Sequence, residues 1–394
     1  MRGGAPAGGD PRITRIRVHR YEHEVQDLGV DYNGFNQVYE PGGRLRMAGY
    51  VTAIETDAGV TGEYAGGDGP SLAQIGTFAH YLLGRNPLER ELIHNDLKRA
   101  LRKIDRLGMG PVDCCLWDLA GKLAATPVWR LLGGWRTRIP CYASTYHGDH
   151  QPAGLSSPEA FAEFAVECRQ RGYPAMKIHP WGAPVIRQEV ANVRAVREAV
   201  GDDFDLMLDP ACEYDTFLDT LKVGRACDEA RFLWLEDPMK EGGISGQGYR
   251  KLRQLIHTPI LIGEHVRGFE PKVDLLAEQA TDLIHCDPNY DMGITGVMKI
   301  AHACEGFGVD CQLHAPGPAQ RACIAAIRNT NYYEMGLVHP KVRGQAPIYA
   351  SDYADGLEAV DDQGRVPVPE GPGLGVTYDW DWIRAHGEQI AVYE

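Results

Sequence analysis

Three acidic residues end three short apolar segments, and their spacing suggests a metal site. The segments are Asp205–Asp209, Phe232–Glu236 and Pro259–Glu264. Asp209, Glu236 and Glu264 are 27 and 28 residues apart, which fits one strand, one loop, one helix and one return loop. Short apolar runs bounded by breakers are typical of buried parallel strands. Carboxylates on three successive strand ends would converge, and oxygen ligands favour a hard divalent cation, Mg²⁺ first and Mn²⁺ as the alternative.

Taken singly, each of these acids could equally be a solvated loop residue or a helix cap, because Asp and Glu are mostly exposed in proteins. Their recurrence at the same place in a repeated unit favours the metal site.

Five further polar residues lie at the ends of neighbouring apolar segments: Lys177, His179, Asp287, His314 and Glu334. Residues two apart in a strand face the same side, so Lys177 and His179 point together. Removing the weakly acidic proton next to a carboxylate needs a divalent cation and a base of near-neutral pKa. Histidine suits this task, and Asp287 would fix the tautomer of His314 and raise its basicity.

Structural interpretations of the same residues stay open. His314 could be a structural histidine, Lys177 an ion-pair partner of the acids, and Glu334 an acid at a helix start. His147 and His150 could form a second metal site, but we interpret both as loop residues.

Alternating strands and helices from residue 139 onward predict the elements that position these side chains. The candidate strands are Ile139–Ser144, Ala175–His179, Asp205–Asp209, Phe232–Glu236, Ile260–Glu264, Leu283–Asp287, Asp310–His314 and Tyr332–Met335. The helical stretches between them are Pro158–Arg171, Val185–Val200, Thr216–Glu229, Tyr249–Ile256, Pro271–Gln279, Ile294–Phe307 and Ala319–Arg328. This alternation predicts a (β/α)₈ TIM barrel, whose active sites lie at the C-terminal strand ends. An open doubly wound sheet is the alternative, but no G-x-G-x-x-G follows a strand.

The N-terminal part reads as strands followed by helices, an α+β arrangement. Strands are expected at Ile16–Tyr21 and Ala48–Glu55, with an irregular loop at 24–47 that covers a site. Helices are expected at Ala73–Leu83, Pro87–Ile104 and Gly110–Leu132. We therefore divide the chain into a disordered tail (1–12), a capping domain (13–135), a barrel domain (136–345) and a segment (346–394) that packs back on the capping domain.

Composition limits the classes of partner and compartment. The 394 residues are 44% hydrophobic and 24% charged, which is ordinary for a globular protein. The net charge of −14 argues against nucleic acid and anionic membranes as partners. Ten cysteines without a C-x-x-C pair favour reduced thiols and a cytoplasmic location. No apolar run reaches the roughly 18 residues of a membrane helix, and residues 1–11 have no apolar core of the kind a signal peptide carries.

These motifs together resemble the enolase superfamily, mandelate racemase subgroup, from residue 13 to the end. Gly110–Gly134 resembles the linker into the barrel, and Trp234–Pro238 and Ile262–Glu264 resemble the metal-ligand motifs. The intervals of 23, 27 and 20 residues that follow Glu264 fit the order of Asp, His and Glu in the subgroup.

The resemblance implies a role for each residue. Asp209, Glu236 and Glu264 would bind Mg²⁺, and His314 with Asp287 would act as acid and base on one face of the substrate. Glu334 would hydrogen-bond the metal-bound carboxylate. Lys177 matches the first lysine of the Lys-x-Lys motif of the subgroup, whereas His179 replaces the second, which puts racemization in doubt. The resemblance also implies a homo-oligomer, from dimer to octamer.

We therefore predict a Mg²⁺-dependent enzyme that removes the α-proton of a carboxylate through a metal-stabilised enediolate. The expected outcome is dehydration of a sugar acid to a 2-keto-3-deoxy acid, with Tyr32 and Asn289 among the polar groups that bind substrate. A racemase, epimerase or lactone cycloisomerase is the alternative. A metal-binding protein without catalysis is a third reading, and it would show a lost base or ligand.

Overall fold

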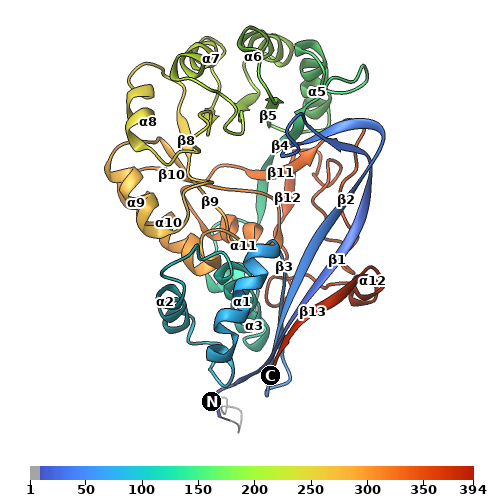
Figure 1. The fold of residues 1–394 in the computed structure, drawn as a ribbon, viewed down its shortest axis with the longest axis vertical. Helices are drawn as coiled ribbons and strands as arrows, with labels where there is room; N and C mark the ends of the chain where they lie inside the picture. The colour runs from blue at the N-terminus through green and yellow to red at the C-terminus, as the bar shows by residue number, and fades with distance from the viewer. Residues whose placement is uncertain (1–8) are drawn as a thin grey trace.

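The structure is a computed structural model that describes residues 9–394, so most of the predicted tail (1–12) lies outside the described residues. Its capping domain starts with strands β1 (Ile13–Val30), β2 (Gln37–Thr56) and β3 (Thr61–Ala65), which form antiparallel pairs. β1 and β2 make a long hairpin that runs from the capping domain up beside the barrel (Figure 1).

The hairpin corrects the irregular loop expected at 24–47. Pairing between β1 and β2 continues from the Ile13–Thr56 pair to Val30–Gln37, so only 31–36 form the turn. Much of β2 between Glu40 and Tyr50 is exposed or half-buried. One face of the hairpin packs on the barrel through Val25, Leu28 and Tyr39. The shift in register between Gln26 and Leu28 interrupts the alternation by which strands are recognised.

Four helices complete the N-terminal part: α1 (Gly69–Leu82), α2 (Arg90–Ala100), α3 (Met109–Leu123) and α4 (Val128–Leu131). The single helix expected over Gly110–Leu132 is thus broken at 124–127. Ala125 has a positive φ of 48°, and Pro127 cannot donate a helical hydrogen bond, so the chain turns before α4.

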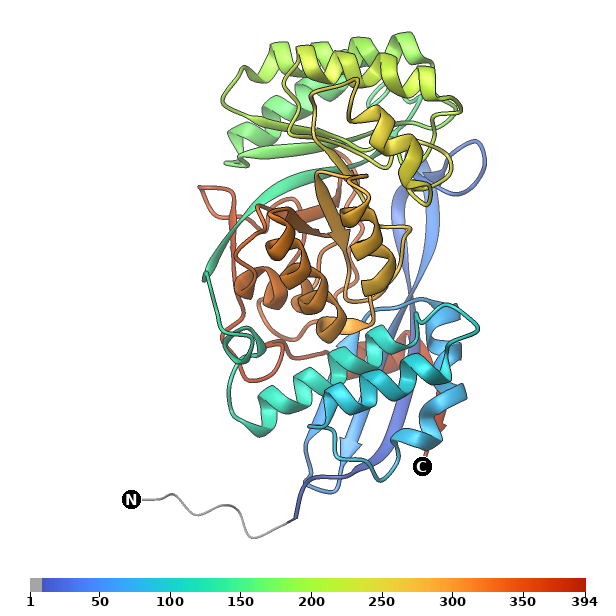
Figure 2. The same cartoon turned by 90° about the vertical axis from the view of Figure 1, so that its left-hand side faces the viewer.

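Eight parallel strands form the barrel, and seven helices alternate with them. The strands are β4 (Arg138–Gly148), β5 (Ala175–Trp181), β6 (Asp205–Leu208), β7 (Trp234–Glu236), β8 (Ile260–Ile262), β9 (Leu283–Cys286), β10 (Asp310–Leu313) and β11 (Tyr333–Val338). The helices are α5 (Pro158–Gln170), α6 (Ile186–Val200), α7 (Phe217–Glu229), α8 (Gly246–Leu252), α9 (Phe269–Ala277), α10 (Gly293–Phe307) and α11 (Pro318–Ala326). The capping domain lies at one end of the long axis, below the barrel (Figure 2).

The strand order is β11-β4-β5-β6-β7-β8-β9-β10, in which neighbouring strands pair in parallel. At the seam between β10 and β11, the Gln312 side chain donates to the Tyr332 carbonyl (3.0 Å) and the Asn331 amide donates to Asp310 (3.2 Å). The predicted (β/α)₈ fold with an N-terminal capping domain is confirmed.

The C-terminal segment contacts both parts of the molecule. It contains β12 (Arg365–Pro367), α12 (Trp380–Ala385) and β13 (Gly387–Tyr393). β12 pairs with the first barrel strand, β4, and β13 pairs with β1 of the capping sheet. The two ends of the described chain therefore lie close together in Figure 1.

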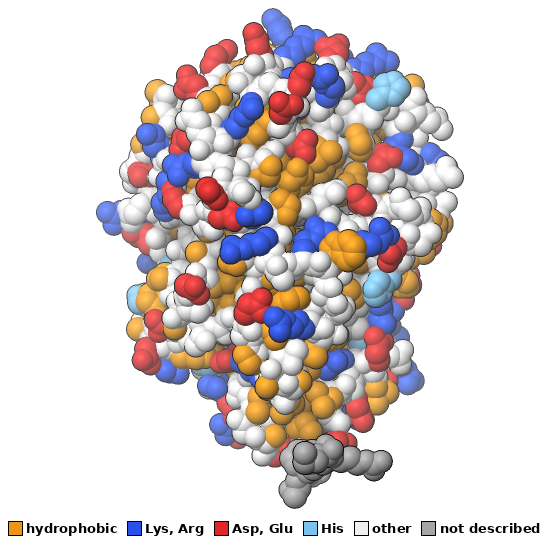
Figure 3. Space-filling model, turned by 180° about the vertical axis from the view of Figure 1, so that it is seen from behind, with side chains coloured by type: hydrophobic (Ala, Val, Ile, Leu, Met, Phe, Trp, Pro, Cys, Tyr) orange, Lys and Arg blue, Asp and Glu red, His pale blue; other side chains and the backbone are white. Residues whose placement is uncertain are grey.

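Three further observations concern the cysteines, the apolar segments and the net charge of the sequence. All ten cysteines are free thiols. Within residues 9–394, no helix is long and apolar enough to cross a membrane. Acidic and basic side chains are interspersed over the face seen in Figure 3, so the excess of negative charge does not gather there.

Candidate active site

The inward side chains of the barrel change from apolar to polar within two residues. One inward layer is a cluster of apolar side chains: Tyr142, Ala175, Met207, Trp234, Leu261 and Leu283. Alternate residues of a strand face the same side, so the residues two positions further on also point inward. They are Ser144, Lys177, Asp209, Glu236, Gly263 and His285. The apolar layer thus forms the floor of a polar mouth at the C-terminal strand ends.

Lys177 occupies the centre of this mouth. Its Nζ lies 3.1 Å from Glu236 Oε2, 3.0 Å from Glu334 Oε1 and 3.4 Å from Asp209 Oδ2. The lysine is 1% exposed. Burial lowers the pKa of Lys177, but Glu236 and Glu334 raise it by more, so the pKa lies well above its usual value and the amine stays charged.

The carboxylates gather around a possible cation position. Ligand atoms of Glu236, Glu264 and His285 lie within 4.8 Å of one another. Asp209 is not one of these three residues, but it lies next to them, because Lys177 contacts both Asp209 and Glu236. Burial raises the pKa of Asp209, yet Lys177 and His179 hold it well below its usual value. The candidate ligands are therefore anionic and rich in oxygen, which suits a hard divalent cation.

His285 was not recognised from the sequence. It is fully buried, and its Nδ1 lies 3.0 Å from Glu236 Oε1. The signal was available, because His285 stands two residues before Asp287 on the same strand and therefore faces the same side.

Asp237 and His265 were also missed. Ligand atoms of Asp237, Glu264 and His265 lie within 4.8 Å of one another. Among the described residues, neither carboxylate oxygen of Asp237 has a hydrogen-bond partner. Burial and the nearby Glu264 raise the pKa of Asp237 well above its usual value.

His314 and Asp287 form a hydrogen-bonded pair. His314 Nδ1 lies 2.7 Å from Asp287 Oδ2, and His314 Nε2 lies 3.5 Å from Glu264 Oε1. Burial lowers the pKa of His314, but Glu264 and Asp287 raise it by more, to about 10. A cation on Glu264 would offset part of this rise, because it would cancel negative charge beside the ring.

His179 lies on the opposite side of the mouth and has both ring nitrogens engaged. Its Nδ1 is 2.7 Å from the Thr145 carbonyl, and its Nε2 is 2.9 Å from Asp209 Oδ2. His147 packs against it, with ring centroids 4.9 Å apart. Burial and His179 lower the pKa of His147 to about 3, so this ring is neutral. His147 belongs to β4, which corrects its interpretation as a loop residue.

Glu334 lies beneath the mouth on β11. Its Oε1 accepts a hydrogen bond from Ser144 Oγ (2.8 Å), and its Oε2 accepts one from the Ala315 amide (2.7 Å). Burial raises the pKa of Glu334, but Lys177 and His314 hold it far below its usual value. Glu334 is therefore an acceptor in this arrangement.

The structure places two predicted substrate-binding residues elsewhere. Tyr32 is 62% exposed at the hairpin turn, and its hydroxyl donates to Glu213 (3.2 Å). Asn289 directs its amide to Asp287 and to the capping domain. Neither is among the residues that line the cavity at the mouth, and their contact with substrate stays a prediction. Asn36, from the same hairpin turn as Tyr32, does line the cavity.

The cavity at the mouth has a volume of about 430 Å³. It is lined by Asn36, His147, Lys177, His179, Asp209, Ala211, Glu264, His265, His314, Ala315, Pro316, Glu334, Gly336 and Leu337. The sequence therefore predicted six of the polar residues that meet in one cavity: Lys177, His179, Asp209, Glu264, His314 and Glu334. Glu236 and Asp287 support them from below.

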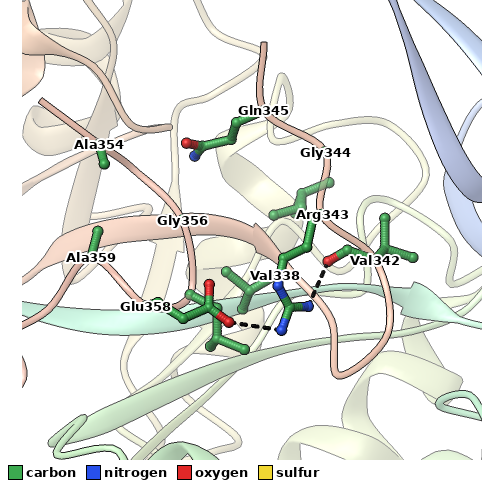
Figure 4. Close-up of a pocket in the computed structure, with 11 residues that line it drawn as sticks. Val338, Val342, Arg343, Gly344, Gln345, Ala354, Gly356, Glu358 and Ala359 are labelled. Atoms are coloured by element: carbon green, nitrogen blue, oxygen red, sulfur yellow. Dashed lines mark hydrogen bonds and ion pairs between the residues drawn. The ribbon is translucent and has the colours of Figure 1, made fainter. Parts of the chain in front are cut away.

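A second cavity of about 340 Å³ shares Leu337 with the cavity at the mouth. Figure 4 shows the side chains that line it. Its walls are mostly apolar. Its two charged residues, Arg343 and Glu358, pair with each other at 2.7 Å. It offers no acid or base free for chemistry, so the cavity at the mouth is the candidate active site.

Fold and site define the class as a (β/α)₈ barrel with an N-terminal capping domain and a mouth lined by acids. The chain belongs to the enolase superfamily, in its mandelate racemase and muconate lactonizing enzyme group. The family described as enolase C-terminal domain-like matches residues 160–382. The mandelate racemase / muconate lactonizing enzyme N-terminal domain matches residues 44–133.

The individual relatives include both dehydratases and a cycloisomerase. The chain is 29% identical over 345 residues to D-gluconate dehydratase of Thermoproteus tenax, a match that covers 82% of this chain and 67% of that protein. It is 26% identical over 385 residues to D-galactarolactone cycloisomerase of Agrobacterium fabrum, covering 94% and 97%. Among solved structures, D-glucarate dehydratase from Agrobacterium tumefaciens complexed with magnesium has a TM-score of 0.85 at 28% identity, covering 96% and 99%.

Proposed function

We propose that this protein is a Mg²⁺-dependent enzyme that removes the α-proton of a carboxylate and dehydrates a sugar acid to a 2-keto-3-deoxy acid. The observation that carries the proposal is the His314–Asp287 pair, 2.7 Å apart, with His314 Nε2 turned toward Glu264 and the cavity. The similarity to D-gluconate and D-glucarate dehydratases supports the reaction class.

Asp209, Glu236 and Glu264 would hold the cation, and His285 and Asp237 are the neighbours best placed to assist. The unpartnered oxygens of Asp237 and the gathered carboxylates support this assignment, because buried anions need a compensating charge. When bound, Mg²⁺ supplies positive charge that stabilises the charge developing on the substrate carboxylate.

The neutral ring of His314 takes the α-proton at Nε2, because a cation held by Glu264 would cancel negative charge that otherwise keeps His314 protonated. Asp287 accepts the Nδ1 proton, which leaves the Nε2 lone pair facing the cavity and stabilises the imidazolium that forms. The imidazolium of His314 then gives its proton to the β-hydroxyl, which leaves as water, and the resulting enol tautomerises to the 2-keto-3-deoxy acid. Proton transfer of this kind contributes about 10²- to 10⁴-fold to a rate.

Lys177 is the hydrogen-bond donor for the substrate carboxylate. Glu334 would need a proton to donate, and its low pKa removes that proton. Lys177 keeps its charge, and its Nζ lies 3.0 Å from Glu334 Oε1. Glu334 therefore accepts a hydrogen bond from Lys177 and holds this donor in position.

A racemase, epimerase or cycloisomerase is the second candidate, and the similarity to D-galactarolactone cycloisomerase favours it. A two-base racemase needs a second base on the face opposite His314. His179 is on that side, but its nitrogens already contact Thr145 and Asp209. This engagement favours dehydration.

A library of acid sugars incubated with Mg²⁺ tests the proposal. Keto acid is detected with semicarbazide, and the same mixtures are run in D₂O and examined by proton NMR. We expect a keto acid from one compound, and His314→Asn should lower its formation by about 10²-fold or more. Deuterium in an epimer without keto acid would move the protein to the isomerases. Full turnover by His314→Asn would refute the assignment of the pair.

A further inference from the structure

We propose that Asn289 is a positioning residue that ties the His314–Asp287 pair to the capping domain. The inference rests on the proposed function, which makes that pair the acid and base. Asn289 lies in the turn between β9 and α10, two residues after Asp287.

On the barrel side, Asn289 holds one oxygen of Asp287. Its backbone N–H donates to Asp287 Oδ1 (2.7 Å), and its side-chain Nδ2 donates to the same oxygen (3.0 Å). The other oxygen, Oδ2, receives the His314 ring at 2.7 Å. Gln320 Nε2 also donates to Oδ1, at the longer distance of 3.4 Å. A carboxylate held at Oδ1 cannot rotate without breaking these bonds, so Asn289, which supplies the two shorter ones, does most to direct Oδ2 toward His314.

On the capping side, the side-chain amide oxygen of Asn289, Oδ1, accepts two hydrogen bonds. The Tyr64 hydroxyl donates to Oδ1 at 3.0 Å, and the Gly67 N–H donates to it at 2.9 Å. Tyr64 belongs to β3 and is 1% exposed. The side-chain amide of Asn289 thus joins the capping sheet to the acid–base pair.

Two glycines show how closely the capping domain approaches this turn. A Cβ on Gly66 would lie 2.5 Å from Asn289 Oδ1, and a Cβ on Gly110 would lie 2.4 Å from the backbone carbonyl oxygen of Asn289. Only glycine fits at such distances. The capping domain therefore contacts the Asn289 turn from two sides, and its docking and the orientation of Asp287 are coupled.

Asn289→Asp is the sharpest test, because the size is kept and the Nδ2 donor is replaced by an oxygen that repels Asp287. Asn331→Asp is the matched control: Asn331 also donates to an aspartate, Asp310, but before β11 at the other end of the barrel. Tyr64→Phe removes one of the two contacts from the capping side and leaves that of the Gly67 N–H. Tyr81→Phe is its control, because the Tyr81 hydroxyl donates to Asp96 within the capping domain.

Two readouts are measured on the Mg²⁺-loaded protein. With a substrate from the screen, Asn289→Asp should lower kcat by about ten- to hundredfold and leave KM within about twofold. Tyr64→Phe should give a smaller loss of the same kind, and the two controls should match the unmodified protein. A raised KM with unchanged kcat would make Asn289 a substrate contact and overturn the proposal.

Amide hydrogen exchange gives the second readout and needs no substrate. We expect faster exchange over 287–293 in Asn289→Asp and Tyr64→Phe, and unchanged exchange there in the controls. Exchange unaltered in both variants would overturn the coupling whatever reaction the protein performs. If the screen finds no dehydration but the exchange changes as expected, the proposed function fails while the link between the domains stands. Tyr64→Phe keeps the test decisive if Asn289→Asp does not fold.

Discussion

At the scale of single residues, the site depends on a buried amine that compensates buried acids. Lys177 contacts Asp209, Glu236 and Glu334, each of which is at most 4% exposed. Removing one partner of a buried ion pair leaves an uncompensated charge, which typically costs 3–5 kcal/mol. Lys177 therefore holds the cluster together as well as facing the cavity.

The same charge balance predicts how a cation affects stability. An ion that binds only the folded state stabilises it by mass action, so Mg²⁺ added to protein treated with EDTA should raise Tm by roughly 2–5 °C. Glu236→Gln should stay folded, because β7 is otherwise apolar and Lys177 keeps two acidic partners. It should lose both the Mg²⁺-dependent rise and the activity.

Thermal unfolding with and without Mg²⁺ measures this effect. Glu241→Gln is the control, because Glu241 is exposed in the loop that follows β7. If Glu236→Gln keeps the full rise in Tm, the cation binds elsewhere.

Individual site residues differ in how far the sequence could predict them. Asp209, Glu236 and Glu264 follow apolar runs, so the change from apolar to acidic marks each strand end. His285 and Asp237 carry no such mark, because one precedes the end of its strand and the other follows a predicted ligand directly. The position of His285 two residues before Asp287 was a usable signal. Asp237 could be assigned only from the structure, which places its oxygens beside Glu264 and His265.

At the scale of elements, helix α6 contains a buried acid that should make stability depend on pH. Glu189 is fully buried and accepts a hydrogen bond from the Tyr214 hydroxyl at 3.2 Å. Burial raises the pKa of Glu189 to about 8, from 4.5. The unfolded chain gives up its proton near pH 4.5, whereas the folded protein keeps it, so the contribution of Glu189 to stability is lost as pH rises through 8.

Glu189→Gln should remove this loss. The variant keeps an acceptor for Tyr214 and carries no charge, so at pH 8.5 it should be more stable than the unmodified protein by about 1–3 kcal/mol. Near pH 4.5 the difference should vanish. Urea unfolding at several pH values measures both, with Glu198→Gln, an exposed acid on the same helix, as the control. Parallel pH profiles for Glu189→Gln and the unmodified protein would contradict the assignment.

The β1–β2 hairpin was not predicted from the sequence, whereas the barrel strands were, and the burial of these strands explains the difference. The barrel strands are buried on both faces and read as apolar runs ended by breakers. One face of the outer half of the hairpin is buried, because Val25, Leu28 and Tyr39 pack against Tyr146 and Val342. The register of β1 with β2 shifts between Gln26 and Leu28, and Gly42 and Gly43 interrupt β2, so the sequence shows no clean alternation there. Hydrogen bonds between backbone groups do not depend on side-chain type, so this part of the sequence was interpreted as an irregular loop.

The hairpin turn should contribute to substrate binding through Asn36. Asn36 lines the cavity, and its amide donates to Glu213 (3.3 Å) and Asp31 (2.9 Å). Asn36→Ala should raise KM by about 2- to 10-fold, the worth of a typical hydrogen bond, with little change in kcat. Asn33→Ala, in the same turn but outside the cavity lining, is the control. A change confined to kcat would place Asn36 with the reacting groups instead.

At the scale of the whole molecule, the tip of the hairpin carries the most exposed large apolar side chain among the described residues. Phe35 is 85% exposed and Tyr32 is 62% exposed, at the end of an element that projects from the capping domain. Exposed apolar side chains that lie together mark interaction surfaces. A second copy of the chain is the partner that the sequence resemblance implies, and closed symmetric assembly is the commonest arrangement of such chains.

We therefore expect a homo-oligomer, from dimer to octamer, with a mass that is a multiple of 43.5 kDa in light scattering coupled to gel filtration. If the hairpin tip lies in the contact, Phe35→Ser should shift the assembly toward smaller species on dilution, because it removes apolar surface from the interface. Phe307→Ser is the matched control, since Phe307 is 51% exposed at the end of α10, away from the hairpin. A mass of one chain for the unmodified protein at every concentration would refute the assembly. Equal effects of the two substitutions would remove the hairpin tip from its interface.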